Sequence, residues 1–246
     1  MKYAVYVEGQ SEMLFVADVL QKYSDYDPVK CGFRCINLNA DIQEKVSYPI
    51  QGDRHSENFY QIINVNNDNL VASRIKKDSP GLIAQGFDVI LGLRDVYGDT
   101  YKRVTKNQRI ISRQAIEAIH KAQSAAIGIT GHDCRLHFAI MEYEAWMLAM
   151  IEPFASHNSI DIDSIDLPQG FDITCDFEQM VYHPFPIVRK IFNACGEDYH
   201  KHGKESYSFL ATLSVADYEA LRHSGRCPSF SKFIDSLLGG QCPDLP

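Results

Sequence analysis

The chain has 246 residues, of which 45% are hydrophobic and 23% charged, and its formal net charge is −8. This composition is typical of a globular protein with a sizeable core, and the acidic balance excludes a protein that coats nucleic acid through bulk positive charge. No apolar run approaches the roughly 20 residues of a membrane span, and the first residues lack the pattern of a secretion signal. Seven scattered cysteines without a C-x-x-C pair indicate reduced thiols. We therefore expect a soluble, cytoplasmic protein with no membrane partner.

The first 150 residues predict an α/β fold. Five apolar, β-prone runs are expected to form strands, at residues 3–8, 33–38, 59–65, 87–93 and 136–141. Residues with helical spacing lie between these runs, the longest stretch over about 108–126. This alternation favours a mainly parallel sheet flanked by crossover helices. We expect residues 1–150 to form one such domain, with an inserted polar loop near 39–57.

Capping residues indicate where the early helices should begin. Ser11 precedes the helical spacing of residues 12–23 and is expected to serve as an N-cap. Asp68 is expected to cap a helix that runs towards Lys77. Ser79-Pro80 follows in the order of a cap and a first-turn proline, and therefore predicts a further turn.

From about residue 151 the pattern becomes that of a smaller helical region. An acidic, loop-like stretch over 152–178 comes first. Three helices are then predicted, over about 186–194, 215–223 and 229–238. Ser214 is expected to cap the second of these helices. We therefore expect residues 151–246 to form a mainly helical C-terminal cap.

Acidic side chains follow three of the predicted strands. They are Glu8 with Glu12, Asp95 with Asp99, and Glu142 with Glu144. Because the carboxyl ends of parallel strands share one edge of a sheet, we expect these carboxylates to converge. Carboxylates held together near neutral pH repel each other unless a cation lies between them, and hard oxygen ligands favour Mg²⁺ or Mn²⁺. Such a site suits phosphoryl transfer. The alternative is that these acids are solvated turn residues, and that Glu12 is simply favoured near a helix N-terminus.

A basic cluster follows Asp99 closely in the sequence. Its members are Lys102, Arg103, Lys106, Arg109 and Arg113. In an otherwise acidic protein, cations next to the acidic edge could hold the phosphates of a nucleic-acid substrate. The alternative is a solvated face at the start of a helix. A second basic run is less informative, at His200-Lys201-His202-Lys204.

Several short motifs resemble a known family. The opening Val7-Glu8-Gly9-Gln10-Ser11-Glu12 resembles the first motif of Toprim domains, above all the V-E-G-x-[ST]-E form of OLD-family nucleases. The chain is more closely similar to a Toprim-like family catalogued as domain of unknown function 4276. The other motifs that carry this resemblance are Asp95-x-Tyr97-Gly98, Glu142-Tyr143-Glu144-Ala145-Trp146 and Cys227-Pro228-x-Phe230.

The resemblance implies a Toprim-like α/β domain in which a strand-end glutamate and a later D-x-D pair bind Mg²⁺. It gives catalytic and metal-binding roles to Glu8, Glu12 and Asp95. At the second acid of D-x-D this chain has Tyr97 instead. The missing ligand would then come from another acid of the same edge: Asp99, Glu142 or Glu144.

Three functions follow from these observations. The first is an Mg²⁺- or Mn²⁺-dependent nuclease, or a related phosphoryl-transfer enzyme, that acts on DNA or RNA in a bacterial defence setting, with Glu8 as a general base. The second is a non-catalytic Toprim-like module that binds nucleic acid or a protein partner within a defence complex. The third is an enzyme that acts on nucleotides or another small phosphate.

Overall fold

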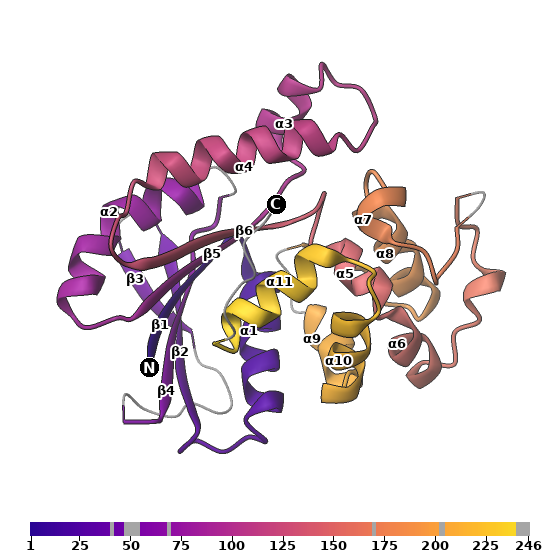
Figure 1. The fold of residues 1–246 in the computed structure, drawn as a ribbon. Helices are drawn as coiled ribbons and strands as arrows, with labels where there is room; N and C mark the ends of the chain where they lie inside the picture. The colour runs from indigo at the N-terminus through magenta and orange to yellow at the C-terminus, as the bar shows by residue number, and fades with distance from the viewer. Residues whose placement is uncertain (40–41, 47–54, 68–69, 169–170, 202–204, 240–246) are drawn as a thin grey trace. The chain divides into compact units, whose positions relative to one another are not determined.

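The computed structural model describes residues 1–39, 42–46, 55–67, 70–168, 171–201 and 205–239 (Figure 1). The chain divides into two compact units. The first unit contains Met1–Arg94 and Ile116–Phe138, and the second contains Asp95–Ala115 and Ala139–Pro246. The expected insertion near 39–57 falls mostly outside the described residues. The expected domain boundary after residue 150 stays a prediction.

The sheet contains all strands of the described residues. They are β1 (Lys2–Val7), β2 (Cys31–Asn39), β3 (Ile42–Val46), β4 (Asn58–Asn64), β5 (Val89–Asp95) and β6 (Asp133–Ala139). Their order across the sheet is β3-β2-β4-β1-β5-β6. Five of these strands are parallel, while β3 pairs antiparallel with β2 at the edge. The predicted α/β fold with a mainly parallel sheet is therefore confirmed.

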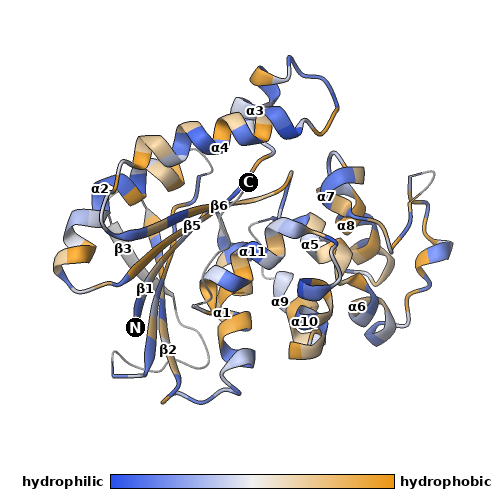
Figure 2. Ribbon diagram, viewed as in Figure 1, coloured by the Kyte–Doolittle hydropathy of each residue, from blue (hydrophilic) through white to orange (hydrophobic). Residues whose placement is uncertain are grey.

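Helices cover both faces of the sheet in the first unit. Helix α1 (Gln10–Tyr23) lies on one face, and α2 (Val71–Ala84) and α4 (Arg113–Ile127) lie on the other (Figure 1). Every residue of β5 is buried, as a strand covered on both faces requires. The α1 ribbon includes hydrophobic stretches, as the hydropathy colours in Figure 2 show, and most of its residues are buried. The core of this unit therefore lies between the sheet and its helices.

Close packing explains a glycine within β5. A Cβ atom added to Gly92 would lie 2.7 Å from Ile75 Cδ1 of α2 and 2.8 Å from Leu136 Cδ1 of β6. Real Cβ atoms do not approach other carbon atoms so closely, because dispersion contacts between carbons are optimal at about 3.5–4.0 Å. The glycine therefore lets α2 approach the sheet.

Two predicted helix boundaries are wrong. Helix α1 begins at Gln10 with the extended residue Gly9 as its N-cap, so Ser11 is buried in the first turn and does not cap the helix. Helix α2 runs through Pro80 and no new turn opens at Ser79. The hydroxyl of Ser79 donates to the carbonyl oxygen of Lys76 (3.3 Å), the acceptor that the N–H missing from Pro80 would have served. The expected cap Asp68 lies outside the described residues.

The second unit is helical. Its described helices, besides the start of α4, are α3 (Asp99–Val104), α5 (Glu144–Ala149), α6 (Ile151–His157), α7 (Phe177–Met180), α8 (Phe185–Ala194), α9 (Ser206–Thr212), α10 (Val215–His223) and α11 (Pro228–Leu237). The three helices predicted after residue 185 are confirmed as α8, α10 and α11. Ser214 caps α10, as predicted, in a capping box with Asp217.

The core of the second unit is aromatic. Trp146 of α5 is fully buried and stacks on Phe233 of α11, with 5.9 Å between the ring centroids. Phe230 meets the indole edge-on at 5.5 Å. This packing anchors α5, which begins at Glu144, and thereby fixes the backbone that carries the candidate site. Among the residues that the structure describes, no helix has both the length and the apolar character that a membrane span needs.

Candidate metal centre

Backbone hydrogen bonds hold two strand ends of the second unit side by side. The amide of Val96 donates to Ala139 O (3.1 Å), and the amide of Tyr97 donates to Met141 O (2.6 Å). Strand-like pairing thus continues beyond β5 and β6. The left-handed backbone of Met141 (φ 65°) then turns the chain into the segment that carries Glu142 and Glu144. The predicted approach of these glutamates to Asp95 follows from this pairing.

Three carboxylates meet at this point, and we name Asp95, Glu142 and Glu144 the acidic triad. Each contributes one oxygen atom to a group in which these atoms lie within 4.8 Å of one another. The three residues are 1%, 2% and 1% exposed, respectively. The backbone amide of Tyr143, between the two glutamates, donates to Asp95 Oδ1 (2.8 Å) and fixes the aspartate. The predicted convergence is therefore confirmed for these three acids.

A lysine ammonium lies among the three carboxylates. Lys201 Nζ is 2.7 Å from Asp95 Oδ2, 3.0 Å from Glu142 Oε1 and 3.5 Å from Glu144 Oε2. The sequence gives little sign of this contact, because Lys201 follows no strand and lies 106 residues from Asp95. Its only sequence signal is the basic run that begins at His200.

Further side chains orient the two glutamates. His183 Nδ1 lies 2.7 Å from Glu142 Oε2, and the amide of Phe185 at the start of α8 donates to the same oxygen (3.1 Å). The phenol of Tyr199 donates to Glu144 Oε1 (3.0 Å). Sequence reasoning missed both His183 and Tyr199, because neither belongs to a spaced motif.

Burial and the attraction between opposite charges shift the pKa values of the triad acids and of the lysine in opposite directions. Burial raises the pKa of Asp95, although Lys201 partly offsets this effect. Burial also raises the pKa of Glu142, but the hydrogen bond from His183 and the charge of Lys201 outweigh it, so this pKa lies below its ordinary value. Burial lowers the pKa of Lys201, but the three carboxylates raise it well above its ordinary value. The lysine is therefore a fixed cation at neutral pH and is not suited to act as a base.

The donor set of the triad fits a hard divalent cation. Buried carboxylate oxygens are the ligands that Mg²⁺ and Mn²⁺ prefer. The ammonium of Lys201 contacts the carboxylates of the triad, so the space between them favours a positive charge. The triad could thus hold a divalent metal ion if the ammonium shares the site or withdraws from it.

The other predicted acids occupy the positions in the secondary structure that the sequence implies. Glu8 follows β1 directly, and Glu12 is buried in the first turn of α1. Both belong to the first unit, and their part in a metal site stays a prediction. Asp99 is exposed at the start of α3 and is not one of the three acids whose oxygens meet. Its role as a ligand also stays a prediction.

The predicted basic cluster lies in α3, the loop after it and the first turn of α4. Four of its members are exposed: Arg103, Lys106, Arg109 and Arg113. The buried phenol of Tyr101 closes the loop, because it donates to Ile110 O (2.8 Å) and accepts from the amide of Ser112 (2.7 Å). The hydrogen bonds of Tyr101 therefore hold the backbone of the loop that carries the basic side chains.

Tyr97 links the basic cluster to the triad. Lys102 Nζ lies 4.3 Å from the centroid of the Tyr97 ring, which stacks on His183 at 4.5 Å. His183 in turn contacts Glu142. Tyr182 meets the Tyr97 ring edge-on at 5.4 Å. Where the resemblance expects a second acid, the chain therefore has a tyrosine whose ring contacts both a cation of the basic cluster and His183, a partner of the triad.

A fourth buried carboxyl of the second unit lies outside the triad. Glu178 of α7 accepts hydrogen bonds from Trp146 Nε1 (3.0 Å) and from the amide and hydroxyl of Ser229. Burial raises the pKa of this carboxyl to about 7. The hydrogen bonds of this carboxyl join α7, α5 and α11. Because it is a buried carboxyl outside the triad, its substitution is a control for substitutions within the triad.

The fold and the site together describe an α/β protein with a buried carboxylate cluster that could bind a metal ion. The family model described as Domain of unknown function (DUF4276) matches residues 7–238, and the chain belongs to this family. The predicted membership is thereby confirmed, while the wider link to Toprim nucleases stays a prediction. No curated protein and no solved structure shows significant similarity to the chain.

Proposed function

We propose that the protein is a metal-dependent nuclease, or a related phosphoryl-transfer enzyme, that acts on nucleic acid. The observation that carries this proposal is the buried acidic triad, whose three oxygens lie within 4.8 Å of one another around a seated cation. Few structural tasks require three carboxylates in one buried position, because their mutual repulsion is unfavourable without a cation. A divalent metal bound there would supply a Lewis acid that neutralises charge on a phosphate and activates water.

The residues around the triad have distinct tasks in this proposal. Asp95, Glu142 and Glu144 hold the metal, and Lys201 compensates their charge before the metal binds. His183 and Tyr199 orient the glutamates through their hydrogen bonds. The Toprim resemblance also implies roles for Glu8, as a ligand or general base, and for Glu12.

The basic cluster supports a polymeric substrate. Its five cations are distributed over residues 102–113, and Tyr97 and His183 connect it to the triad. Cations spread over a fixed loop suit the repeated phosphates of DNA or RNA better than a single small phosphate. A setting in bacterial defence, as the resemblance implies, is part of this proposal.

Cleavage and metal binding test the proposal together. We expect the wild type to cleave single- or double-stranded DNA or RNA with Mg²⁺ or Mn²⁺ and not with EDTA. Glu142→Gln keeps the size of the side chain but removes its charge, and should lower the rate by at least about 100-fold. Glu178→Gln makes the same change at a buried site outside the triad and should retain activity at pH 6. Equal loss in both variants, or none in Glu142→Gln, would contradict the assignment.

One observation favours a second function. Lys201 already neutralises part of the triad, so the cluster can be a structural ion network in a non-catalytic module that binds nucleic acid or a protein partner. Calorimetry distinguishes the two functions. Heat of Mn²⁺ binding that disappears in Asp95→Asn supports the metal centre, whereas no binding at millimolar Mn²⁺ supports the module.

A further inference from the structure

Three rings of the second unit contact one another beside the acidic triad, and we name Tyr97, Tyr182 and His183 the aromatic cluster. The rings of Tyr97 and His183 are stacked, with 17° between their planes, and Tyr182 meets Tyr97 edge-on. All three side chains are partly exposed. Because His183 also contacts Glu142, the aromatic cluster adjoins the proposed metal ligands.

The Tyr182 side chain is the member of this cluster without a structural task. Among the residues that the structure describes, none forms a hydrogen bond with its phenol, and no ring stacks on it. Tyr97 and His183, in contrast, stack on each other and orient Glu142. A tyrosine in the interior usually finds a partner for its hydroxyl, so Tyr182 is better explained by a contact with a ligand.

Cations of the basic cluster adjoin these rings. Lys102 Nζ contacts the Tyr97 ring, as described above. Burial raises the pKa of Tyr182, and the nearby charge of Arg109 partly offsets this rise. Arg113 Nη2 donates to Gln179 Oε1 (2.7 Å) and thereby ties the start of α4 to α7, which ends two residues before Tyr182. Rings and cations are therefore held close together.

Most cations of the basic cluster have no acidic partner in the part of the chain that the structure describes. No carboxylate there forms an ion pair with Lys102, Arg103, Lys106 or Arg109. Asp99, at the start of the same helix, is not paired with them either. Cations without a partner in the fold favour an external anion.

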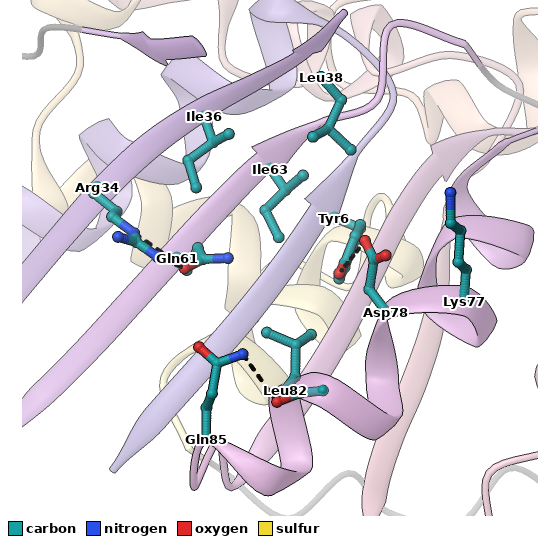
Figure 3. A pocket seen from close by; sticks show the side chains of 11 residues that line it. Tyr6, Arg34, Ile36, Leu38, Gln61, Ile63, Lys77, Asp78, Leu82 and Gln85 are labelled. Carbon is teal, nitrogen blue, oxygen red and sulfur yellow. Dashed lines mark hydrogen bonds between the residues drawn. The ribbon is translucent and has the colours of Figure 1, made fainter. Parts of the chain in front are cut away.

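The polar side chains at a cavity of the first unit, between the sheet and α2, differ in this respect. Tyr6 there donates to Asp78 (3.0 Å), and Arg34 donates to Gln61 (Nε at 3.0 Å), as Figure 3 shows. These groups bond to one another within the fold. The basic cluster and Tyr182 therefore give the clearer sign of a binding partner.

Rings beside cations match the two parts of a nucleotide, its base and its phosphate. A ring can stack on a base only where that base is not already stacked within a duplex, whereas cations bind the phosphates of either form. Stacking contributes about 1–3 kcal/mol per base and accepts every base, because each has a flat face. Charge alone would instead favour the duplex, which has the higher density of phosphates.

We propose that the substrate is a single strand of nucleic acid, with its phosphates on the basic cluster and one base stacked on Tyr182. This inference rests on the proposed function for the cleavage of the strand, but binding of the strand does not require the metal. A base held at Tyr182 would position its strand beside the metal ligands.

Fluorescence anisotropy on the full chain in EDTA measures this binding without cleavage. The probes are a thymidine strand of about 12 nucleotides, an abasic strand with the same phosphates, and a duplex of the same length. We expect the thymidine strand to bind at least about tenfold more tightly than the abasic strand and the duplex. A uridine strand shows whether RNA binds in the same way as DNA.

Matched variants separate stacking from charge. Tyr182→Leu keeps an apolar side chain but removes the flat ring, and should weaken binding of the thymidine strand about tenfold without affecting the abasic strand. Tyr182→Phe keeps the ring and should bind like the wild type. Tyr207→Leu, at a 41% exposed tyrosine of α9 outside the aromatic cluster, should also bind like the wild type. Arg109→Ala should weaken binding of both strands and lower the slope of the salt dependence by about 1.

The proposal is overturned if no strand binds, if the abasic strand or the duplex binds as tightly as the thymidine strand, or if Tyr182→Leu binds like Tyr182→Phe. Cleavage assays with Mn²⁺ distinguish its failure from that of the proposed function. A protein that prefers the thymidine strand but cleaves nothing contradicts only the nuclease. A protein that cleaves a duplex and does not prefer the single strand contradicts only the stacking site.

Discussion

Replacing Lys201 with methionine separates the two possible roles of the acidic triad. The change removes the ammonium and keeps a side chain of similar length. Each of the three contacts, at 2.7–3.5 Å, attracts by about 5 kcal/mol at an effective dielectric constant near 20, and desolvation offsets most of this. Removal of one partner from a buried ion cluster costs about 3–5 kcal/mol net. In a chain of this size, we expect the unfolding temperature in EDTA to fall by about 10 °C.

The same substitution should strengthen metal binding. A divalent cation at the triad would be repelled by an ammonium in the same position, so Lys201→Met should bind Mn²⁺ at least about tenfold more tightly than the wild type. Saturating Mn²⁺ should then restore about 3 kcal/mol of the lost stability when it is present at 100 times its dissociation constant. Thermal unfolding and calorimetry, each with and without Mn²⁺, measure both effects.

Lys190→Met is the matched control. Lys190 belongs to the same unit, but its ion pair with Asp166 is solvent-exposed, so its loss should cost less than about 1 kcal/mol. If Lys201→Met and Lys190→Met unfold at the same temperature in EDTA, the triad does not depend on the ammonium and the electrostatic reasoning is wrong. If Lys201→Met is destabilised and Mn²⁺ does not restore it, the cluster is a structural ion network.

Substitutions at three further positions test the description of the fold. Burial raises the pKa of Glu178 from its ordinary 4.5 to about 7. The free energy of unfolding should therefore fall by up to about 3 kcal/mol as the pH rises through 7. Glu178→Gln should flatten this pH dependence, which urea titrations at several pH values measure. Gly92→Ala should destabilise by about 1–3 kcal/mol, because its Cβ would collide with Ile75 and Leu136; an unchanged urea midpoint would refute the close packing. Ser214→Ala should cost about 1 kcal/mol through the lost cap of α10, and Ser214→Asn should recover part of it in the same assay.

The acids of the triad could be predicted because each lies at the end of a strand or shortly after it. Asp95 ends β5, and the two glutamates follow β6 within five residues. Parallel pairing places the carboxyl ends of neighbouring strands together, so sequence position alone brings these side chains close. Lys201 reaches the same point from a segment between α8 and α9, where no periodic pattern restricts its position. A contact made by tertiary folding of this kind leaves no local signal.

Pro80 shows where a local rule fails. The order Ser79-Pro80 is typical of a helix start, yet α2 continues through it. The apolar positions Val71, Ile75 and Leu82 of α2 are buried, and this burial stabilises a continuous helix despite the proline. The hydroxyl of Ser79 compensates one carbonyl oxygen, so the residue that suggested a break helps to avoid one.

The phenol of Tyr101 has a consequence for how the basic cluster would meet a polyanion. Its two hydrogen bonds tie Ile110 and Ser112 to α3, and they therefore restrict the conformations of the loop before any ligand arrives. A phosphate chain would then lose mainly its own conformational freedom on binding, since little ordering of the protein backbone remains to be done. Such rigidity favours fast capture by charge, and the strength of capture would then respond to salt concentration more than to the sequence of the bound strand.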